Sequence, residues 1–118
     1  MKFETERFIC EIHDDIAHVR FKGAHVAEYS QASHLPPELR RVVASYEFRV
    51  LVLDCEALTF LTSTVLEGFV SAYLRCRKLG RVVRIVHADP LVREMLRTTQ
   101  VDVLMPVFDR LDDALKTD

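Results

Sequence analysis

Hydrophobic residues in this chain occur in short runs that are separated by amphipathic stretches. The continuous run Val50-Leu51-Val52-Leu53 stops at Asp54. Short uninterrupted runs of branched aliphatic residues are typical of strands buried on both faces, and a buried parallel strand is followed by a crossover, usually a helix. We therefore expect residues 49–53 to form a buried parallel strand that leads into a helix.

Two segments ahead of this run have the composition and spacing of a β-hairpin. Residues 8–12 and 16–21 are rich in β-branched and aromatic side chains, and the turn signal His13-Asp14-Asp15 lies between them. The second segment alternates, with Ile16, His18 and Arg20 on one face and Ala17, Val19 and Phe21 on the other. This period of two predicts a strand with one buried face.

An amphipathic stretch on each side of the buried strand predicts a helix. Pro37 suits a first helical turn, and apolar residues recur at helical spacing over residues 37–45. The second helix is expected over residues 64–79, with an inner stripe of Leu66, Phe69, Val70, Tyr73 and Leu74. Thr64 and Glu67 fit a capping box, Ser63 is an equally good N-cap, and Gly80 fits the position after the helix.

The last third of the chain continues the alternation of strands and helices. Residues 82–86 predict a strand that ends at His87, and Asp89 caps a helix that begins at Pro90 and reaches about residue 98. The inner face of that helix is expected to carry Leu91, Val92, Met95 and Leu96. Residues 103–105 predict a short last strand, and Asp109 is expected to cap a terminal helix with Leu111, Ala114 and Leu115 facing inward.

The predicted order is therefore β-β-α-β-α-β-α-β-α. An opening hairpin followed by βαβ units implies an α/β fold with a mixed sheet of about five strands packed by helices. The chain of 118 residues shows no linker, repeat or low-complexity segment, so residues 1–118 are expected to form a single domain.

Composition excludes several classes of function. The net charge of -2 provides no basic surface for nucleic acid. No apolar run reaches membrane-spanning length, and the start MKFETERF lacks the apolar core of a signal peptide. We therefore expect a cytoplasmic protein that binds no nucleic acid and does not insert directly into a membrane. A homodimer is compatible with these features.

No metal site or cofactor is expected from the sequence. Cys10, Cys55 and Cys76 are far apart, so they suggest buried thiols rather than a zinc site or a disulfide framework. His25 and His34 lie in an irregular stretch beside Tyr29, but no third ligand follows at helical or hairpin spacing.

Enzyme chemistry is not indicated either. Ser63 lies between a strand and a helix, but Leu61 and Val65 stand where a nucleophile elbow has glycines. Of the histidines, His87 alone is expected to approach Ser63, and neither an orienting acid nor an oxyanion site is apparent. We therefore expect a protein without catalysis of its own.

Asp54, His87 and Asp89 follow strands that are expected to be parallel. The carboxyl ends of such strands are where open α/β sheets bind ligands, so a small-ligand or nucleotide sensor is one interpretation. Helix capping and hydrogen bonds within loops also explain these residues, and we favour that interpretation.

Three hydroxyl residues, Thr62-Ser63-Thr64, stand at the start of the second predicted helix. One of them suffices as a cap. A phosphate on another would add about -1.5 to -2 charge and would meet the positive end of the helix. It could therefore change the binding of a partner while leaving the fold intact.

Several stretches, taken in order, resemble the STAS domain family of anti-sigma factor antagonists and sulfate transporter tails. In that family an apolar strand ends in Asp, and a hydrophobic residue followed by Asp-Ser-Ser-Gly-Leu opens a helix. The corresponding residues here are 50–54 and then Leu61-Thr62-Ser63-Thr64-Val65-Leu66, with Thr62 in place of Asp and Val65 in place of Gly. Residues 79–80, 89–96 and 107–115 add to the resemblance, which covers residues 8–115.

The resemblance implies a regulatory protein–protein interaction module in a partner-switching pathway that controls a sigma factor. Ser63 matches the serine that a GHKL-type serine kinase/anti-sigma factor phosphorylates and a PP2C-type phosphatase restores, with Thr62 and Thr64 as alternative acceptors. The partner-binding surface would consist of Thr62, Ser63, Thr64, Val65, Glu67 and Gly68. ATP and Mg²⁺ would belong to the kinase. The alternative is a STAS scaffold or accessory subunit of a larger signalling or transporter assembly, without a phosphoswitch.

Overall fold

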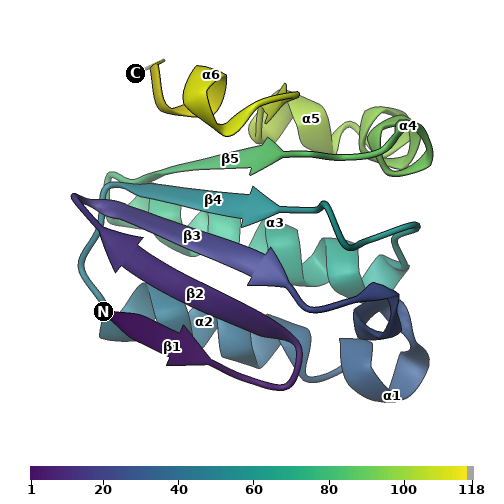
Figure 1. Cartoon of the computed structure of the whole chain (residues 1–118), viewed down its shortest axis with the longest axis horizontal. Coiled ribbons are helices and arrows are strands. Elements are labelled where there is room, and N and C mark those ends of the chain that lie inside the picture. The colour runs from purple at the N-terminus through teal and green to yellow at the C-terminus, as the bar shows by residue number, and fades with distance from the viewer. Residues whose placement is uncertain (117–118) are drawn as a thin grey trace.

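A six-stranded sheet forms the centre of the computed structural model, which describes residues 1–116 (Figure 1). The strands lie side by side in sequence order: β1 (Lys2–Glu4), β2 (Phe8–His13), β3 (Ile16–Phe21), β4 (Val50–Asp54), β5 (Val82–Val86) and β6 (Val107–Phe108). β1, β2 and β3 pair antiparallel, whereas β3 to β6 pair parallel. The predicted mixed sheet and its opening hairpin are confirmed.

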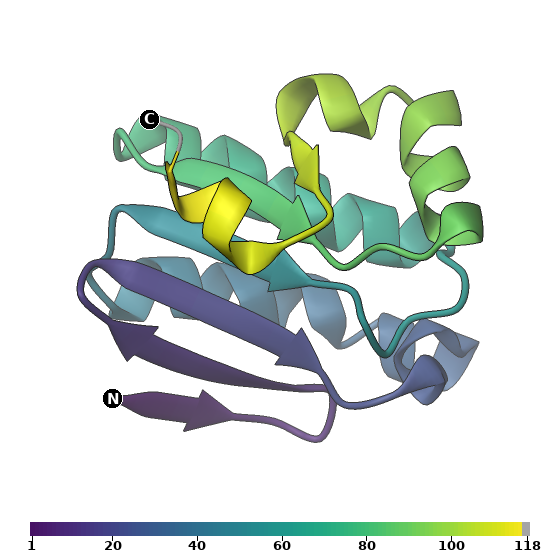
Figure 2. The same ribbon diagram turned by 45° about the horizontal axis from the view of Figure 1, so that its top comes forward.

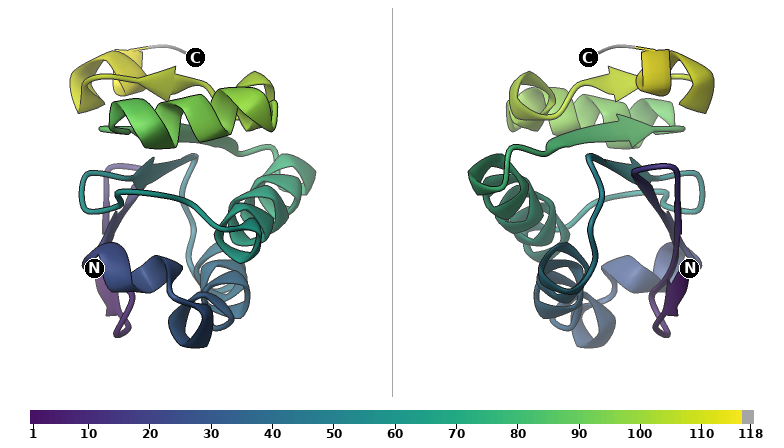
Figure 3. Two further views of the ribbon diagram at one scale, coloured as in Figure 1. Left: turned by 90° about the vertical axis from the view of Figure 1, so that its right-hand side faces the viewer. Right: turned by 90° about the vertical axis from the view of Figure 1, so that its left-hand side faces the viewer.

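Helices connect the parallel strands. The long helices are α2 (Leu35–Ser45), α3 (Ser63–Lys78) and α4 (Pro90–Thr98), and the short ones are η1 (Ala24–Ala27), α1 (Tyr29–Ala32), α5 (Val101–Leu104) and α6 (Leu111–Lys116). Figure 3 shows α2 and α3 together on one face of the sheet and α6 on the other. Among the helices of residues 1–116, none has the length and apolar character needed to cross a membrane.

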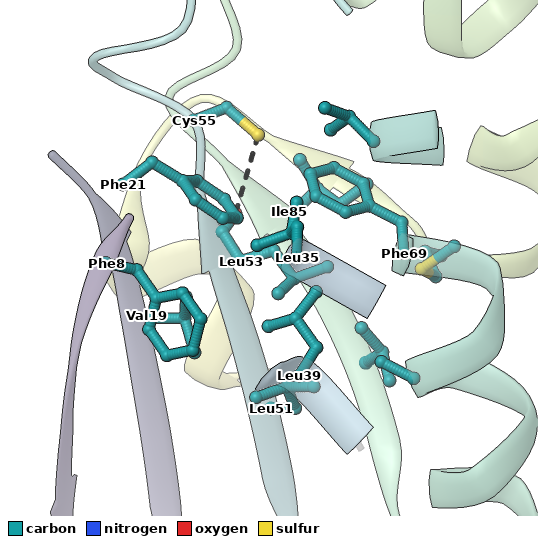
Figure 4. Close-up of a cluster of buried hydrophobic side chains, with 14 of the residues drawn as sticks. Phe8, Val19, Phe21, Leu35, Leu39, Leu51, Leu53, Cys55, Phe69 and Ile85 are labelled. Carbon is teal, nitrogen blue, oxygen red and sulfur yellow. Dashed lines mark hydrogen bonds between the residues drawn. The ribbon is translucent and has the colours of Figure 1, made fainter. Parts of the chain in front are cut away.

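The main core lies between the sheet and the pair α2 and α3. Strand residues such as Phe8, Val19 and Leu53 point toward Leu39 of α2 and Phe69 of α3 (Figure 4). The ring of Phe21 stacks on that of Phe69, with centroids 5.7 Å apart. The alternation predicted for residues 16–21 is confirmed, because Ala17, Val19 and Phe21 are all buried.

The opposite face of the sheet is covered in part by α6 (Figure 2). Val50, Val52 and Val86 form a smaller buried cluster there with Ala114 of α6. Arg84 is only 4% exposed and donates a hydrogen bond from its guanidinium to the Ala114 carbonyl oxygen, at 2.6 Å. All five residues of β4 are therefore buried, as expected for a strand covered on both faces.

The predicted inner stripe of α3 is correct in part, because Phe69 is buried and Leu66, Val70 and Tyr73 are partly buried against the core. The residues that the structure buries are Val65, Gly68, Phe69, Ala72 and Cys76, whereas Leu74 is 49% exposed. Gly68, Ala72 and Cys76 were left out of the predicted stripe because small side chains contribute little to a hydrophobic pattern. One of them, Gly68, faces Pro36 of α2. Gly80 does follow the helix in a left-handed conformation (φ 72°), as predicted.

The predicted last strand at residues 103–105 is also wrong. Residues Val101–Leu104 form the short helix α5, and the strand that pairs with β5 is Val107–Phe108. Gln100 ends the preceding helical stretch in a left-handed conformation (φ 62°), so the chain turns before α5 begins. A short apolar run cannot by itself distinguish a strand from a buried helical turn.

Two further boundaries differ from the prediction. α2 begins at Leu35, and both Pro36 and Pro37 lie within its first turn, where a missing N–H is tolerated. β1 was not predicted, because Lys2–Glu4 is short and mostly polar. It pairs with β2 at the edge of the sheet.

Candidate functional site

Thr62 caps the amino terminus of α3. Its backbone is extended (φ -108°, ψ 167°), and its side-chain oxygen accepts a hydrogen bond from the Val65 N–H at 3.3 Å. The prediction that Thr64 or Ser63 provides the cap is therefore wrong. Val65, at the third helical position, points into the core. The start of α3 is therefore held by the hydrogen bond between Thr62 and Val65 and by the burial of the Val65 side chain.

Ser63 is the first residue of α3, and its side chain is exposed. Because Thr62 satisfies the cap, the hydroxyl of Ser63 is not needed to begin the helix. Thr64 follows and is half-buried. The hydroxyl triplet thus divides into one structural residue and two residues that can face a partner.

The predicted partner-binding surface is only partly at the surface. Ser63 and Glu67 are exposed and Thr62 is half-buried, whereas Val65 is fully buried and Gly68 is buried as well. The assignment of Val65 and Gly68 to this surface is corrected. Gly68 faces Pro36 of α2, and an added Cβ would lie 3.5 Å from atoms of that proline, which is ordinary contact.

A hollow of about 240 Å³ lies beside Ser63, between the amino end of α3 and helix α4. Its lining includes Leu61, Leu66 and Met95, together with the more polar Glu94 and Thr98. The backbone N–H of Leu61 also contacts the Met95 sulfur at 3.3 Å. The sequence did not reveal this hollow, because α4 lies about thirty positions further along the chain.

The orientation of α4 explains which of its residues reach the hollow. Val92 and Leu96 are buried, as predicted, and Met95 is half-buried. Leu91 is 53% exposed, so its predicted inward position is wrong. Glu94, Met95 and Thr98 are thus the residues of α4 that line the hollow beside the start of α3.

A larger hollow of about 680 Å³ lies between α2 and α3. Its apolar lining consists of Val43, Ala44, Val70, Leu74 and Leu79, and Glu67, Arg75 and Lys78 border it. Leu74 and Leu79, which are about half exposed, contribute the most accessible apolar surface. The sequence interpretation placed Leu74 in the core and so missed this groove.

A second polar site is centred on Asp54 at the carboxyl end of β4. The Asp54 carboxylate is only 4% exposed. Its Oδ2 lies 2.8 Å from Nε2 of His18, and its Oδ1 lies 3.0 Å from Nδ1 of His87. The backbone N–H of Glu56 donates to the same Oδ1 at 3.1 Å. The expectation that Asp54 and His87 share one edge of the sheet is confirmed.

Asp89, the third residue predicted at this edge, has a different role. It is the N-cap of α4, and its carboxylate accepts a hydrogen bond from the Val92 N–H at 2.9 Å. His18 was missed as a neighbour of Asp54 because it belongs to the opening hairpin. The alternation along β3 could have found it, since it places His18 on the same face as Asp54.

Burial by itself would raise the pKa of Asp54. The hydrogen bonds from His18, His87 and the backbone of Glu56 outweigh this effect and hold the pKa below its ordinary value. Asp54 is therefore a carboxylate at neutral pH. His87 has a left-handed backbone (φ 59°), which is uncommon for a residue other than glycine.

The Nδ1 atom of His87 is paired with Asp54 and not with Ser63. The histidine that was expected to be able to approach Ser63 therefore has another partner.

The three cysteines are buried, and burial raises the pKa of Cys10 to about 12 and that of Cys76 to about 11. Burial also raises the pKa of Cys55. These thiols are protonated and enclosed.

Comparison with known proteins identifies the family to which the chain belongs. Residues 7–114 match the family model of the STAS domain, so the chain belongs to the STAS domain family. No curated protein sequence matches the chain significantly.

Solved structures agree with this assignment. An anti-sigma factor antagonist from Mycobacterium paratuberculosis is 28% identical, with a TM-score of 0.78 over 92% of this chain and 90% of that chain. A STAS domain protein from Planctomyces limnophilus is 16% identical, with a TM-score of 0.80 over 95% and 97%. The anti-sigma factor antagonist SpoIIAA in its unphosphorylated form is 10% identical, with a TM-score of 0.69 over 92% and 93%. The last two likenesses concern the fold alone.

Proposed function

We propose that this protein is a cytoplasmic anti-sigma factor antagonist, without catalysis of its own, that is switched by phosphorylation of Ser63. A GHKL-type serine kinase that is also the anti-sigma factor phosphorylates Ser63 with its own ATP and Mg²⁺. A PP2C-type phosphatase removes the phosphate. The unphosphorylated protein binds the kinase through the amino end of α3, and a sigma factor is thereby released.

The observation that carries this proposal is that Thr62 caps α3 while the neighbouring Ser63 is exposed. Thr62 caps α3 through its hydrogen bond with Val65, so the fold does not depend on the Ser63 hydroxyl. Ser63 is exposed at the first helical position, where an enzyme can reach it. Capping alone accounts for one of the three hydroxyl residues, and Ser63 is the most accessible of the remainder.

A phosphate on Ser63 suits a switch that leaves the fold unchanged. It would lie at the amino end of a 16-residue helix, where free backbone N–H groups and the helix dipole stabilise negative charge. The added charge of about -1.5 to -2 would also stand near Glu67 and Glu94. A partner packed on this surface would then meet concentrated negative charge that must be desolvated, so its affinity falls.

The docking surface in this proposal consists of the exposed and half-buried residues around Ser63. Thr62, Thr64 and Glu67 surround the serine on α3. Leu66 and Met95 line the adjoining hollow and supply apolar contact. A partner side chain that enters this hollow would contact both α3 and α4. Because Ser63 borders the hollow, its phosphorylation would directly affect binding of that side chain.

Intact-mass measurement tests the phosphoacceptor. The full chain is incubated with a GHKL-type serine kinase of the same organism and ATP–Mg²⁺, and one phosphate is expected. Ser63→Ala should lose that phosphate, whereas Ser71→Ala, a serine further along α3, should retain it. Retention by Ser63→Ala but not by Thr62→Val or Thr64→Val would move the site to a neighbouring threonine and contradict the Ser63 assignment.

The groove between α2 and α3 favours a second candidate function. Its half-exposed Leu74 and Leu79 suit a lasting apolar contact, which a scaffold or accessory subunit of a larger assembly would need. Leu74→Glu would then abolish co-purification with the assembly, and phosphatase treatment would not affect it. Under the first function, Leu74→Glu leaves the Ser63-dependent switch intact.

A further inference from the structure

The side chains around Asp54 bring several potential metal-ligand atoms close together. Asp54, Glu56 and His87 each place one potential metal-ligand atom within 4.8 Å of the other two. Within residues 1–116 no other group of three or more His, Cys, Asp or Glu residues meets this condition. The cluster is separate from Ser63, since it lies at the opposite end of the connection between β4 and α3.

We propose that Asp54, Glu56 and His87 form a binding site for a divalent first-row transition metal ion, with Zn²⁺ as the best match. One imidazole nitrogen and two carboxylate oxygens suit Zn²⁺, whereas Mg²⁺ and Ca²⁺ prefer oxygen ligands alone. Three protein ligands leave one tetrahedral position for water or for a donor atom of a partner.

The spacing between Asp54 and His87 fits such an ion with little movement. Donor atoms at about 2.0–2.2 Å from a tetrahedral zinc ion lie about 3.3–3.6 Å from one another. Oδ1 of Asp54 and Nδ1 of His87 are 3.0 Å apart, so a shared proton can be replaced by an ion after a shift of a few tenths of an ångström. The Glu56 carboxylate is exposed and can move to complete the set.

His18 is a positioning residue for this site. It holds the other carboxylate oxygen of Asp54 through its Nε2 at 2.8 Å, which leaves Oδ1 directed toward His87. Outer partners of this kind orient metal-binding carboxylates and histidines, and their loss typically lowers metal affinity about 10–100-fold. Because His18 comes from β3, it ties the site to the rigid sheet rather than to the loop.

Charge supports an ion at this position. Two carboxylates approach each other here, and the Asp54 carboxylate is almost buried. A cation that lies between two carboxylates is attracted by both of them. A divalent ion would neutralise both carboxylates, and an imidazole coordinates metals in its neutral form.

The test measures binding of Zn²⁺ to the full chain after removal of any affinity tag, by isothermal titration calorimetry with ZnCl₂ at pH 7.5 in a buffer without phosphate. One ion per chain is expected, and MgCl₂ should produce no binding at the same concentration. Glu56→Gln and His87→Asn should abolish stoichiometric binding. Asparagine is chosen at position 87 because it tolerates a left-handed backbone.

Matched controls separate ligation from general damage. His34→Ala removes an exposed histidine outside the cluster and should leave Zn²⁺ binding unchanged. His18→Ala should lower the affinity about 10–100-fold without changing the stoichiometry, and His18→Gln, which keeps a donor group, should restore part of it. Circular dichroism should show that each variant is folded.

The proposal is overturned if the folded wild-type chain binds no stoichiometric Zn²⁺, or if Glu56→Gln and His87→Asn bind it as tightly as the wild type. Equal loss of binding in His34→Ala would equally contradict the assignment, because that residue lies outside the cluster.

Discussion

The connection from Cys55 to Thr62 joins two polar sites of opposite character. At its start, the Asp54 carboxylate is almost buried, and three hydrogen-bond donors hold it. At its end, Ser63 is exposed at the first position of α3, and the cap is provided by Thr62. A buried, fully partnered group ties the fold together, whereas an exposed hydroxyl can be modified without cost to the fold. Sites of both kinds lie within ten positions of each other.

Removal of the Asp54 carboxylate should have the largest effect on stability. Asp54→Ala deletes the acceptor shared by His18, His87 and the backbone of Glu56. Hydrogen bonds to charged groups contribute about 1.5–3 kcal/mol each, and part of that is lost to solvent at the half-buried histidines. We expect the free energy of unfolding in urea to fall by about 2–3 kcal/mol in the presence of EDTA. A loss below about 0.5 kcal/mol would show that Asp54 does not secure this end of the sheet.

Removal of the Thr62 cap should have the second-largest effect on stability. Thr62→Ala removes the acceptor for the Val65 N–H, and loss of such a cap costs about 1 kcal/mol. Thr62→Ser keeps the hydroxyl and should retain most of the stability. Urea unfolding of both variants checks the assignment, which is wrong if Ser63→Ala destabilises the protein more than Thr62→Ala does.

Gly68 distinguishes packing from docking. A Cβ at this position would make ordinary contact with Pro36, and alanine is favoured over glycine within a helix by up to about 1 kcal/mol. We therefore expect Gly68→Ala to stabilise the protein by about 0.5–1 kcal/mol and to leave partner binding unchanged. Weaker binding to the kinase, with the fold intact, would return Gly68 to the docking surface.

Substitutions of Ser63 should have the smallest effect on stability. Exposed positions away from caps usually change the free energy of unfolding by less than about 0.5 kcal/mol, so Ser63→Ala should be near neutral. Ser63→Asp places a negative charge at the helix amino end and should stabilise by about 0.3–1 kcal/mol. Thermal melting of the two variants beside the wild type measures both values. A large loss in Ser63→Asp would mean that the serine is structural after all.

The regular elements could be predicted from the sequence where several local signals agreed. β4 and the hairpin followed from uninterrupted and alternating hydrophobic patterns. The start of α4 followed from Asp89 and Pro90, and the structure confirms the Asp89 cap. The prediction failed for α5, where a short apolar run has no period of its own. For the inner face of α3 the prediction was correct in part: Phe69 is buried, but the small residues Gly68, Ala72 and Cys76 were left out, and Leu74 is exposed.

The site was less accessible to sequence reasoning than the fold. The hydroxyl triplet could be found, but the choice of Thr62 as the cap depends on the backbone angles of one residue. The approach of His18 to Asp54 requires knowledge of which strands are neighbours and which faces they share. The hollow beside Ser63 depends on the position of α4 relative to α3, which no local pattern specifies.

Calorimetric titration of the kinase/anti-sigma factor with unphosphorylated and Ser63-phosphorylated protein tests the central claim most directly. We predict that phosphorylation weakens binding at least about tenfold, which corresponds to about 1.4 kcal/mol, while the melting temperature stays equal or rises. Equal affinity of the two forms, or weaker binding accompanied by a fall in melting temperature, would contradict a switch that acts at the surface and leaves the fold intact.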